Sequence, residues 1–575
     1  MKKLVISSLK KYWKQVILTL IFVLLQVYFQ IEIINMSKVI LDSGVKANNF
    51  EVIYNSGILM LLYTLGSMIM VTLVSYITSY ITGKVSFDLR SKMFRKVTDL
   101  SLYDFNKFES ASLMNRATGD INVIQLFILN LLRSCLLIPF VIVGVIIETI
   151  IINKTLALIL IVFFIITILF MFIKGNKSLS FFNKLQKSID KLNSLLREKV
   201  YGVRSIRAFG KEDYERNKFK KANDDSYELS IESSLKLYYV APMAVLLMNI
   251  AVVIIYYVGG IQLQYNMVNV ADLLLFFQYI TYFLSSLALI PFIVRIMPKA
   301  IVASNRIEEV FEYEPTLVNN PTKMEYKEDS FKGVEFNNVI FGYSGAKDVI
   351  ADINFKAPKG TTTALIGATG SGKSTVMYLL NRMYDPTFGE ILIDGINIKD
   401  IDLKELHSKI SFGSQKSMVF NDTVIENIKM SDDSITREDV EKACEITLFT
   451  DAFKSLPSGI DSVIEENGTN LSGGQRQRLS LARTIAQDSD IYVFDDTFSA
   501  LDMKTEKIVR ENIKELLKDK TVFMVAQKIN TIIDADNILV FDAGRIVCQG
   551  THEELLGKCE IYNEIYESQA YMDKE

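Results

Sequence analysis

The sequence predicts a fold in two parts: an all-α domain of six membrane-spanning helices with long cytosolic helical extensions, followed by an α/β domain. Two observations indicate this division. Long apolar runs fill the chain up to about residue 305 and are missing after it. The second part contains TTTALIGATGSGKSTVMYLLNRM, which predicts a strand, a glycine-rich loop and a helix in succession. A chain of 575 residues is long enough for both parts.

Composition agrees with a membrane part joined to a soluble part. The chain is 50% hydrophobic and 22% charged, with a mean hydropathy of +0.24. A net charge of only −3 gives no basic character that would favour nucleic acid as a partner. The cysteines are scattered and form no CxxC or Cys/His cluster, so we expect neither a disulfide framework nor a zinc site. They are Cys135, Cys444, Cys548 and Cys559, and the histidines are His407 and His552.

Six apolar segments are long enough to cross a bilayer as helices, which takes about 20 residues each. Buried helices of a soluble bundle would be shorter and would carry more charge. The first run follows MKKLVISSLKKYWKQ, but it is too long for a signal peptide and no small-residue cleavage site follows it. We place the spans near 15–36, 54–82, 132–152, 155–174, 238–261 and 270–296.

Lysine and arginine in the connections predict the orientation of the spans. The N-terminus is rich in lysine, and so are the long stretches 83–130 and 175–237, which we therefore place in the cytoplasm. The short connections 36–53, 153–154 and 262–269 are nearly free of positive charge and should face outward. The sequence thus predicts a multi-pass protein of the plasma membrane with its N-terminus and its second domain in the cytoplasm.

The two long cytoplasmic stretches read as amphipathic helices that continue the spans into the cytosol. Each pair of helices must turn at a tip, near 103–110 and near 208–216, and these tips are suited to touch a cytosolic domain. Pro291 is expected to kink the last span. Polar residues within the spans are candidates for lining a pathway, with an interfacial position as the alternative for those near segment ends. They are Gln26, Gln30, Glu32, Arg133, Glu148 and Gln278.

We assign residues 1–305 to the membrane domain, 306–330 to a polar linker and 331–575 to the second domain. In that domain, Gly367–Ser374 fits the pattern G-x-x-x-x-G-K-[ST] between a strand and a helix. Its backbone N–H groups can enclose phosphate at a helix N-terminus, Lys373 can reach the β and γ phosphates, and Ser374 can bind Mg²⁺. The predicted nucleotide-binding residues here are Gly367, Thr369, Gly370, Ser371, Gly372, Lys373, Ser374 and Thr375.

The stretch IYVFDDTFSALD at 491–502 supplies a carboxylate that can act together with the phosphate loop. Asp495 ends an apolar strand and is placed to hold Mg²⁺ through water. Phosphate loop and acid together predict an α/β P-loop domain that binds a nucleoside triphosphate with Mg²⁺. Many nucleotide-driven proteins share these two features. The motif LSGGQRQR at 471–478 is more specific and distinguishes one family among them.

With these motifs the whole chain resembles the ABC transporter superfamily, in particular exporter-type half-transporters. The resemblance implies that Tyr343 stacks on adenine and that Gln415 senses the metal ion and the attacking water. It implies that Ser472, Gly473, Gly474 and Gln475 bind the γ-phosphate held by a second subunit, and that SALD (499–502) crosses between two ATPase domains. It also makes the two tips coupling helices, the second of which reaches the partner's ATPase domain.

Two positions depart from the family pattern. Position 496 is Asp where the family has a catalytic Glu, and position 527 is Gln where it has a switch His. A shorter side chain withdraws the carboxylate, and a misplacement of about 1 Å can cost about 100-fold in rate. Gln can bond a phosphate but lacks the proton chemistry of imidazole. The chain therefore resembles the degenerate-site subunit of a heterodimeric bacterial exporter of the multidrug type.

The sequence is also compatible with three alternative functions. The chain could form a homodimer with slow ATPase activity, an ATP-gated regulatory or channel-like membrane protein, or an importer on the exporter architecture. In the favoured reading, its intact LSGGQ completes a competent site with a second half-transporter, and the chain alone has low activity. The expected partners are that second subunit, the lipid bilayer and a small-molecule, lipid or peptide substrate.

Overall fold

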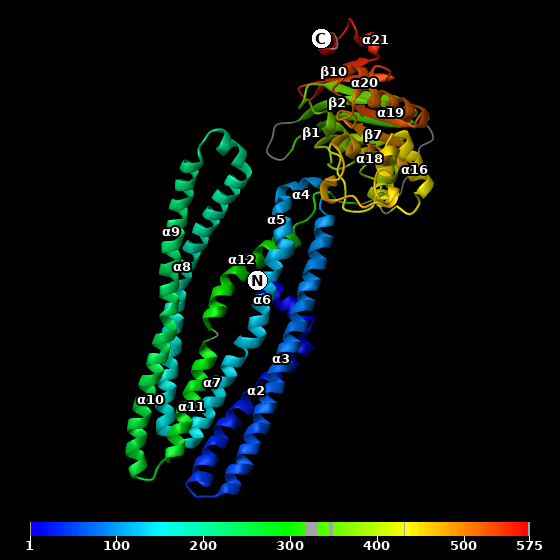
Figure 1. Ribbon diagram of the computed structural model, residues 1–575. Helices are drawn as coiled ribbons and strands as arrows, with labels where there is room; N and C mark the ends of the chain where they lie inside the picture. Colours follow the sequence, from blue (N-terminus) through cyan, green and yellow to red (C-terminus); the bar gives the residue numbers. More distant parts are fainter. Residues whose placement is uncertain are drawn as a thin grey trace. The chain divides into compact units, whose positions relative to one another are not determined.

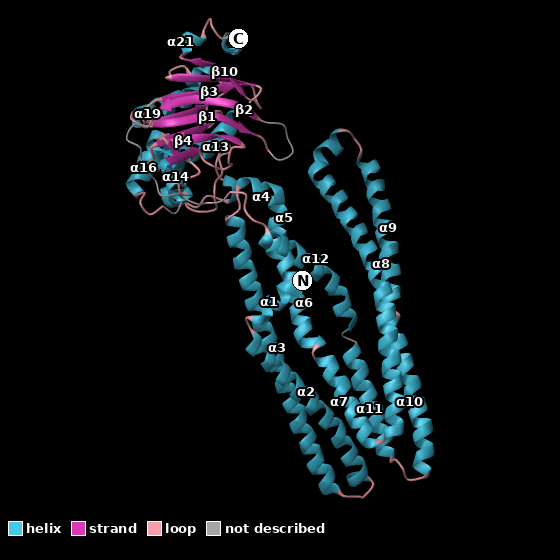
Figure 2. Ribbon diagram, turned by 180° about the vertical axis from the view of Figure 1, so that it is seen from behind, coloured by secondary structure: helices cyan, strands magenta, loops and turns pink. Residues whose placement is uncertain are grey.

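The computed structural model describes residues 2–288, 290–317, 319, 331–343, 349–430 and 432–572. The chain divides into two compact units. Unit 1 comprises Met1–Asp99 and Phe108–Glu314, and unit 2 comprises Leu100–Lys107 and Pro315–Glu575. In the described residues, unit 1 is helical and all strands belong to unit 2 (Figure 2).

The long helices of unit 1 lie alongside one another (Figure 1). Short π-helical turns, labelled η1 to η3, interrupt them. The elements are α1 (Lys2–Lys10), α2 (Trp13–Val39), η1 (Ile40–Val45), α3 (Phe50–Thr98), α5 (Ser110–Asn115), η2 (Arg116–Asp120), α6 (Ile121–Asn130), η3 (Leu131–Cys135), α7 (Leu137–Ile152), α8 (Lys154–Ala208), α9 (Glu212–Tyr238), α10 (Val240–Gln264), α11 (Val270–Leu287) and α12 (Ile290–Glu312).

Six helical segments of the described chain are long and apolar enough to cross a membrane, and each overlaps one predicted span. The sixth ends at Leu287, and a new helix, α12, begins at Ile290, next to Pro291, so the predicted span 270–296 covers parts of two helices. The six segments are Trp13–Val45, Phe50–Thr98, Ser110–Ile152, Lys154–Met171, Pro242–Gln264 and Val270–Leu287.

The predicted extensions beyond the membrane are present as continuous helices. α3 has 49 residues and α8 has 55, so at 1.5 Å per residue they are about 75 and 80 Å long. A bilayer core is only about 30 Å thick, and the remainder must lie outside it. The first tip carries the short helix α4 (Leu102–Phe108), whereas the second is a turn between Ala208 and Glu212.

Asparagine begins the helices that follow the connections predicted to face outward. Asn49 Oδ1 accepts from the backbone N–H groups of Glu51 and Val52 at the start of α3, and Asn153 caps α8 in the same way. Asn269 caps α11 in a capping box with Asp272. These caps satisfy N–H groups that have no partner within the helix and fix where each span starts.

Unit 2 holds two sheets, and its α/β architecture agrees with the sequence prediction. The four-stranded antiparallel sheet has the order β2-β1-β4-β5, and the six-stranded sheet has the order β10-β9-β3-β8-β7-β6. The strands are β1 (Gly333–Phe341), β2 (Ile350–Pro358), β3 (Thr362–Gly367), β4 (Phe388–Ile393), β5 (Ile396–Asn397), β6 (Ile410–Gly413), β7 (Ile491–Asp495), β8 (Thr521–Val525), β9 (Asn537–Asp542) and β10 (Arg545–Gly550).

In the larger sheet, β9, β3, β8, β7 and β6 are parallel, and β10 joins the edge in antiparallel orientation. All residues of β7 and β8 are buried, as expected of parallel strands covered on both faces. Besides α4, the helices of unit 2 in the described residues are α13 (Lys373–Leu380), α14 (Leu403–Lys409), α15 (Val424–Lys429), α16 (Arg437–Ile446), α17 (Thr450–Lys454), α18 (Gly473–Ala486), α19 (Met503–Leu516), α20 (Ile529–Ile532), α21 (His552–Leu555) and α22 (Glu560–Met572), with the 3₁₀ turns η4 (Gly459–Asp461) and η5 (Glu466–Gly468).

Two boundaries differ in detail from the sequence assignment. α12 continues to Glu312, and the division between units falls after Glu314 rather than at 305. Most of the predicted linker, 320–330, lies outside the described residues. One disulfide, between Cys548 and Cys559, was not anticipated from the scattered cysteines; it forms because β10 and the residue before α22 come together in space.

Candidate functional site

The predicted nucleotide-binding residues converge because of the order of the parallel strands. β3, β8, β7 and β6 are neighbours and run in the same direction. Their carboxyl ends therefore share one edge of the sheet, which is where ligands bind in open α/β sheets. The segments that leave this edge carry the glycine-rich loop, Gln415, Asp495–Asp496 and Gln527.

The glycine-rich loop runs from the end of β3 into α13. Gly367 has φ +153°, and a Cβ there would lie 2.1 Å from the carbonyl oxygen of Phe541. Gly372 is the N-cap of α13 with φ +100°, and its Cβ would meet Ile350 at 2.6 Å. A Cβ on Gly370 would meet nothing within 4 Å. Packing within the chain thus requires glycine at the two ends of the loop, whereas Gly370 leaves open space beside backbone N–H groups, as an anion cradle needs.

Lys373 turns back over this loop. Its Nζ donates to the carbonyl oxygens of Gly367 and Ala368, both at 2.8 Å. Burial lowers the pKa of Lys373, and the opposing attraction of Asp496 and Asp495 raises it. The ammonium group is thus held inside the loop, where phosphate oxygens would compete with the two carbonyls.

Ser374 and Asp495 form a site that fits Mg²⁺. Ser374 Oγ donates to Asp495 Oδ1 at 2.7 Å. Asp495 is fully buried, and its Oδ2 has no hydrogen-bond partner of good geometry among the described residues. The Tyr378 hydroxyl contributes only a weak interaction with this carboxyl, and burial, as the largest effect, raises the pKa of Asp495. A buried carboxylate oxygen without a donor is the kind of ligand that a hard cation satisfies.

Asp496 lies between two glutamines. Its Oδ2 accepts from Gln415 Nε2 at 3.1 Å and from Gln527 Nε2 at 2.9 Å. The residue has φ +51°, and its backbone N–H donates to the Val525 carbonyl at 3.0 Å. The structure therefore brings these three side chains together in one hydrogen-bonded group. One carboxylate oxygen is engaged by two amides at once, and the side chain is only 9% exposed.

The predicted adenine-stacking residue lies beside an aromatic group. Tyr343 contacts Tyr384 edge-on at 5.3 Å between ring centroids and Phe341 at 5.0 Å. Its hydroxyl is 3.2 Å from Thr375 Oγ1, at the start of α13. The contact to Thr375 ties the position of the Tyr343 ring to the phosphate loop.

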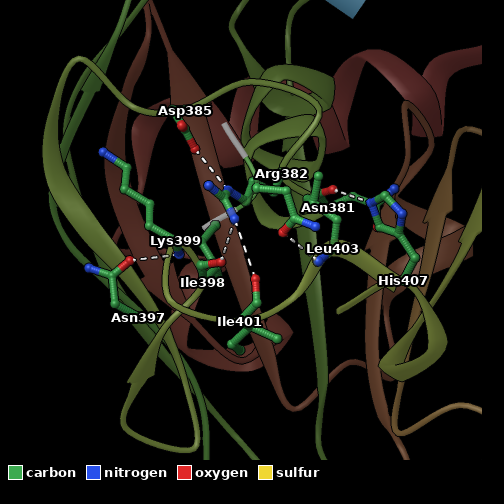
Figure 3. Close-up of polar contacts among 10 residues, drawn as sticks. Asn381, Arg382, Asp385, Asn397, Ile398, Lys399, Ile401, Leu403 and His407 are labelled. Atoms are coloured by element: carbon green, nitrogen blue, oxygen red, sulfur yellow. Dashed lines mark hydrogen bonds and ion pairs between the residues drawn. The ribbon is translucent and has the colours of Figure 1, made fainter. Parts of the chain in front are cut away.

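A polar network holds the segment that follows α13 (Figure 3). Arg382 is buried with φ +48° and donates to the Asp385 carboxylate and to the carbonyl oxygens of Ile398 and Ile401. This network fixes the backbone on both sides of Tyr384. His407 Nε2 lies 3.1 Å from the Asn381 carbonyl oxygen in the same network (Figure 3). The other histidine, His552, contacts the Tyr562 hydroxyl. Both histidines are therefore engaged away from the Gln527 position.

The signature segment forms a capped and exposed helix start. Ser472 Oγ accepts from Gln475 N at 3.3 Å, and Gln475 Oε1 accepts from Ser472 N at 2.7 Å. Ser472 and Gly473 are exposed. A Cβ on Gly473 would meet nothing within 4 Å, and one on Gly474 would lie 3.7 Å from the Ala500 carbonyl oxygen. Packing within this chain does not require either glycine, so their lack of side chains leaves room for a group from outside.

The polar residues of the spans lie in different settings. Glu32 contacts Tyr28 and is electrostatically coupled to Glu148, while Gln26, Gln30 and Gln278 are half-buried and Arg133 is exposed. Tyr279 is fully buried and donates to Asn35 Oδ1 at 2.5 Å. Asp272 pairs with Lys38 at 2.6 Å in addition to its capping role, so a structural function accounts for its charge.

Sequence reasoning missed three groups in unit 2. Buried Asp104 accepts from Ser101 and Thr316, and the Tyr384 ring contacts Tyr343. Gln569 on α22 bonds to the backbone of the Gln527 segment. Only Tyr384 had a visible signal, as an aromatic residue close behind the helix of the phosphate loop. The other two depend on contacts between segments that are far apart in the sequence.

Comparison with known families identifies both parts of the chain. Residues 16–287 match the family described as "ABC transporter transmembrane region", and residues 350–499 match the family "ABC transporter". The structure superposes on that of a bacterial Atm1-family ABC exporter with ATP bound, with a TM-score of 0.81 over 98% of both chains at 22% identity. At that identity the likeness shows a shared fold.

Sequence relatives cover nearly the whole chain. An uncharacterized ABC transporter ATP-binding protein of Mycobacterium tuberculosis is 32% identical over 92% of both chains, and the protein YfiB of Bacillus subtilis, also uncharacterized, is 31% identical over 92% of both. An ATP-dependent lipid A-core flippase of Syntrophus aciditrophicus is 30% identical over 86% of this chain and 82% of its own. With this coverage and the two matched regions, the chain belongs to the ABC transporter family, as a multi-pass membrane protein whose ATPase domain drives transport.

Proposed function

We propose that the chain is one subunit of a heterodimeric exporter in the plasma membrane and that its own ATP site hydrolyses slowly. In this proposal the ATPase domain is cytoplasmic, and substrate leaves the cell by alternating access. Tyr343 stacks on the adenine of ATP, and the loop Gly367–Thr375 holds its phosphates. Ser374, Gln415 and Asp495 hold Mg²⁺, which offsets phosphate charge when it is bound.

The environment of Asp496 is the observation that carries the proposal. A general base must place a free carboxylate oxygen within reach of the attacking water. Here the amides of Gln415 and Gln527 hold Oδ2 of Asp496 and so fix the orientation of the carboxylate. Because the side chain is one methylene shorter than Glu, its other oxygen falls about 1 Å short of the position that a glutamate would reach. Gln527 donates an N–H to this carboxylate but cannot exchange a proton with the γ-phosphate, as a histidine could. The two substitutions act on a single hydrogen-bonded group.

The signature segment supports the second half of the proposal. The start of α18 has a capping box and two glycines, and Ser472 and Gly473 are exposed. N–H groups at a helix N-terminus favour an anion, and packing in this chain gives no other reason for Gly473 and Gly474. In a homodimer this intact segment would serve only impaired sites. In a heterodimer it completes the site of a partner that supplies Glu and His.

The first tip supports coupling of nucleotide to the spans. Leu100–Lys107 belongs to the same compact unit as the ATPase domain, and its Tyr103 packs against the hydrophobic cluster that includes Phe341. Closure of two ATPase domains on ATP would therefore move the ends of α3 and α5, between which this tip lies. The flippase activity named for the Syntrophus relative makes a lipid the first substrate to test, with drugs and peptides as further classes.

The test compares the purified chain with its complex with a half-transporter encoded beside it. We expect the chain alone to hydrolyse ATP at least about 100-fold more slowly than the pair, since both of its sites would contain Asp496. Vigorous hydrolysis by the chain alone would contradict the heterodimer. Transport into inverted vesicles should require hydrolysable ATP. Flux with a non-hydrolysable analogue would instead indicate an ATP-gated channel, and flux in the opposite direction an importer.

A pair of variants in the complex tests the division of labour. Gly474→Ala fits this chain without a clash and should lower ATP turnover by about 100-fold, because the added methyl group meets the partner's γ-phosphate. Asp496→Glu should change turnover by less than about twofold, because Gln527 still limits the same site. A small effect of Gly474→Ala, or a large gain from Asp496→Glu, would show that the proposed asymmetry is wrong.

A further inference from the structure

The bonded cysteines lie near the C-terminus of unit 2, outside the ATP site. Cys548 is a half-buried residue of the edge strand β10, and Cys559, the residue before α22, is 2% exposed. The two cysteines are 11 residues apart in the sequence, and their Cα atoms are 6.3 Å apart. The transport cycle as described above uses neither thiol.

The segment between the two cysteines is already ordered by local contacts. Thr551 and Glu554 form a capping box at the start of α21, and Gly557 N donates to Asn563 Oδ1 at 3.2 Å. His552 Nδ1 lies 2.7 Å from the hydroxyl of Tyr562, which is fully buried. These contacts keep Cys559 close to Cys548 when the bond is absent, so the bond can form and break without unfolding the domain.

The far end of α22 contacts the ATP site. Gln569 Nε2 donates to the carbonyl oxygen of Gln527 at 2.8 Å, and Gln569 Oε1 accepts from Ile529 N at 2.8 Å. Gln527 in turn donates to Asp496. Gln569, Gln527 and Asp496 also line one cavity of about 620 Å³. One helix thus has the cysteine pair at its start and a clamp on the Gln527 backbone near its end.

The two remaining cysteines have different settings. Cys444 is fully buried on α16, and burial raises the pKa of its thiol to about 12, which keeps it protonated and unreactive. Cys135 belongs to η3, within a membrane-crossing segment. Cys548 is therefore the accessible thiol of the ATPase domain, and a partner sulfur lies next to it.

We propose that Cys548 and Cys559 are a reversible modification site for low-molecular-weight thiols and disulfides of the glutathione type, and that the cystine strengthens ATP binding by fixing α22 against the Gln527 segment. The Cys548 thiolate attacks glutathione disulfide and releases one glutathione thiolate. The Cys559 thiolate then attacks the Cys548 sulfur and releases the second. Two protein thiols are oxidised, one glutathione disulfide is reduced to two thiols, and these take the two protons. The link to ATP binding rests on the proposed function of Gln527.

The first experiment maps the bond in the full-length protein in detergent. After treatment with glutathione disulfide, peptide mass mapping should find the peptides of Cys548 and Cys559 joined, and after dithiothreitol both should alkylate. Cys444 should behave the same in both samples. Failure of the two peptides to join under oxidation would overturn the modification site, whatever the ATPase activity of the protein.

The second experiment measures binding of a fluorescent ATP analogue to oxidised and reduced protein. Reduction should weaken binding by about fivefold, the effect of losing about one net hydrogen bond. Gln569→Ala should still form the cystine but lose the redox response. Ser568→Ala, an exposed neighbour on the same helix, should keep it. Equal affinity in both redox states, or a full response in Gln569→Ala, would refute the link through α22.

Discussion

Two neighbouring aspartates at the end of β7 have different hydrogen-bond partners and therefore different chemical roles. Asp495 is fully buried, bonds Ser374 through one oxygen and leaves the other without a donor of good geometry. Asp496 follows it in a left-handed backbone conformation and is held by Gln415 and Gln527. The backbone conformation directs the two carboxylates differently, so one can bind a cation while the other is occupied by amides.

A prediction at this scale concerns Asp495→Asn. Burial raises the pKa of Asp495, so the folded state holds this proton more tightly than the unfolded state does. Stability is therefore lost as pH rises from the unfolded pKa of about 4 through the raised folded pKa. The variant, which still accepts from Ser374, should melt at the same or a higher temperature than wild type at pH 7 without nucleotide.

The same variant should lose the further stabilisation that ATP with Mg²⁺ gives to wild type, because its amide cannot satisfy the cation. Thermal melting with ATP, with and without Mg²⁺, checks this. Any advantage of the variant without nucleotide should shrink as pH falls towards the unfolded pKa. If Mg²⁺ shifted the melting temperature of the variant as much as that of wild type, Asp495 would not be a ligand of the metal site.

At the scale of elements, the short helix α4 packs into the unit that holds the ATPase domain. Asp104 is fully buried there, and its Oδ2 accepts from Ser101 Oγ at 2.7 Å and from Thr316 N at 3.0 Å. Its Oδ1 accepts from Thr316 Oγ1 at 3.0 Å. Asn106, on the same helix, bonds the hydroxyl of Tyr384, whose ring contacts Tyr343. The tip thus contacts the segment that enters the ATPase domain and also Tyr384, the neighbour of the predicted adenine-stacking residue.

We predict that Asp104→Asn uncouples hydrolysis from transport. The amide nitrogen cannot accept from Ser101 or Thr316, and an unsatisfied buried group costs about 1–3 kcal/mol. Hydrogen exchange in residues 100–107 should rise by about tenfold, and transport should fall while basal ATPase activity remains. Asp99→Asn removes an exposed carboxylate just before the tip and serves as the control. Unchanged exchange in Asp104→Asn would show that this carboxylate does not hold α4.

At the scale of the whole molecule, the charges of the connections between the membrane segments predict an orientation. Each of the three connections assigned to the outside leads into an asparagine-capped helix, and the lysine-rich N-terminus and long extensions are assigned to the inside. Single cysteines at Ala47 and Asn266, both exposed, should react with a membrane-impermeant maleimide in intact cells. A cysteine at Lys211, exposed in the second tip, should react only after permeabilisation. Labelling of the Lys211 site in intact cells would show that the predicted topology is inverted.

Much of the fold and of the ATP site could be predicted from local patterns. Length and apolar content predicted six spans, and each overlaps one membrane-length helical segment of the described chain, although the sixth also includes the start of α12. The motifs GATGSGKS, VFDD and LSGGQ each occupy a strand end or a helix start, because their chemistry needs backbone N–H groups or carboxylates at those places. Predicted boundaries were less good where no strong local signal ends an element, as in α12, which continues past residue 305.

The sequence by itself determined which chemical groups the protein has: apolar segments of membrane-spanning length, a glycine-rich loop, Asp495 at a strand end, the LSGGQ segment, and the pair Asp496 and Gln527. Tertiary structure alone decided which of these groups touch. Gln415 and Gln527, 81 and 31 residues from Asp496, bond the same oxygen. Cys548 meets Cys559, and Gln569 holds Gln527 across 42 residues. The physical reason is that hydrophobic period and turn chemistry are local, whereas these contacts depend on strand order and helix packing, which bring remote segments to one edge of the sheet.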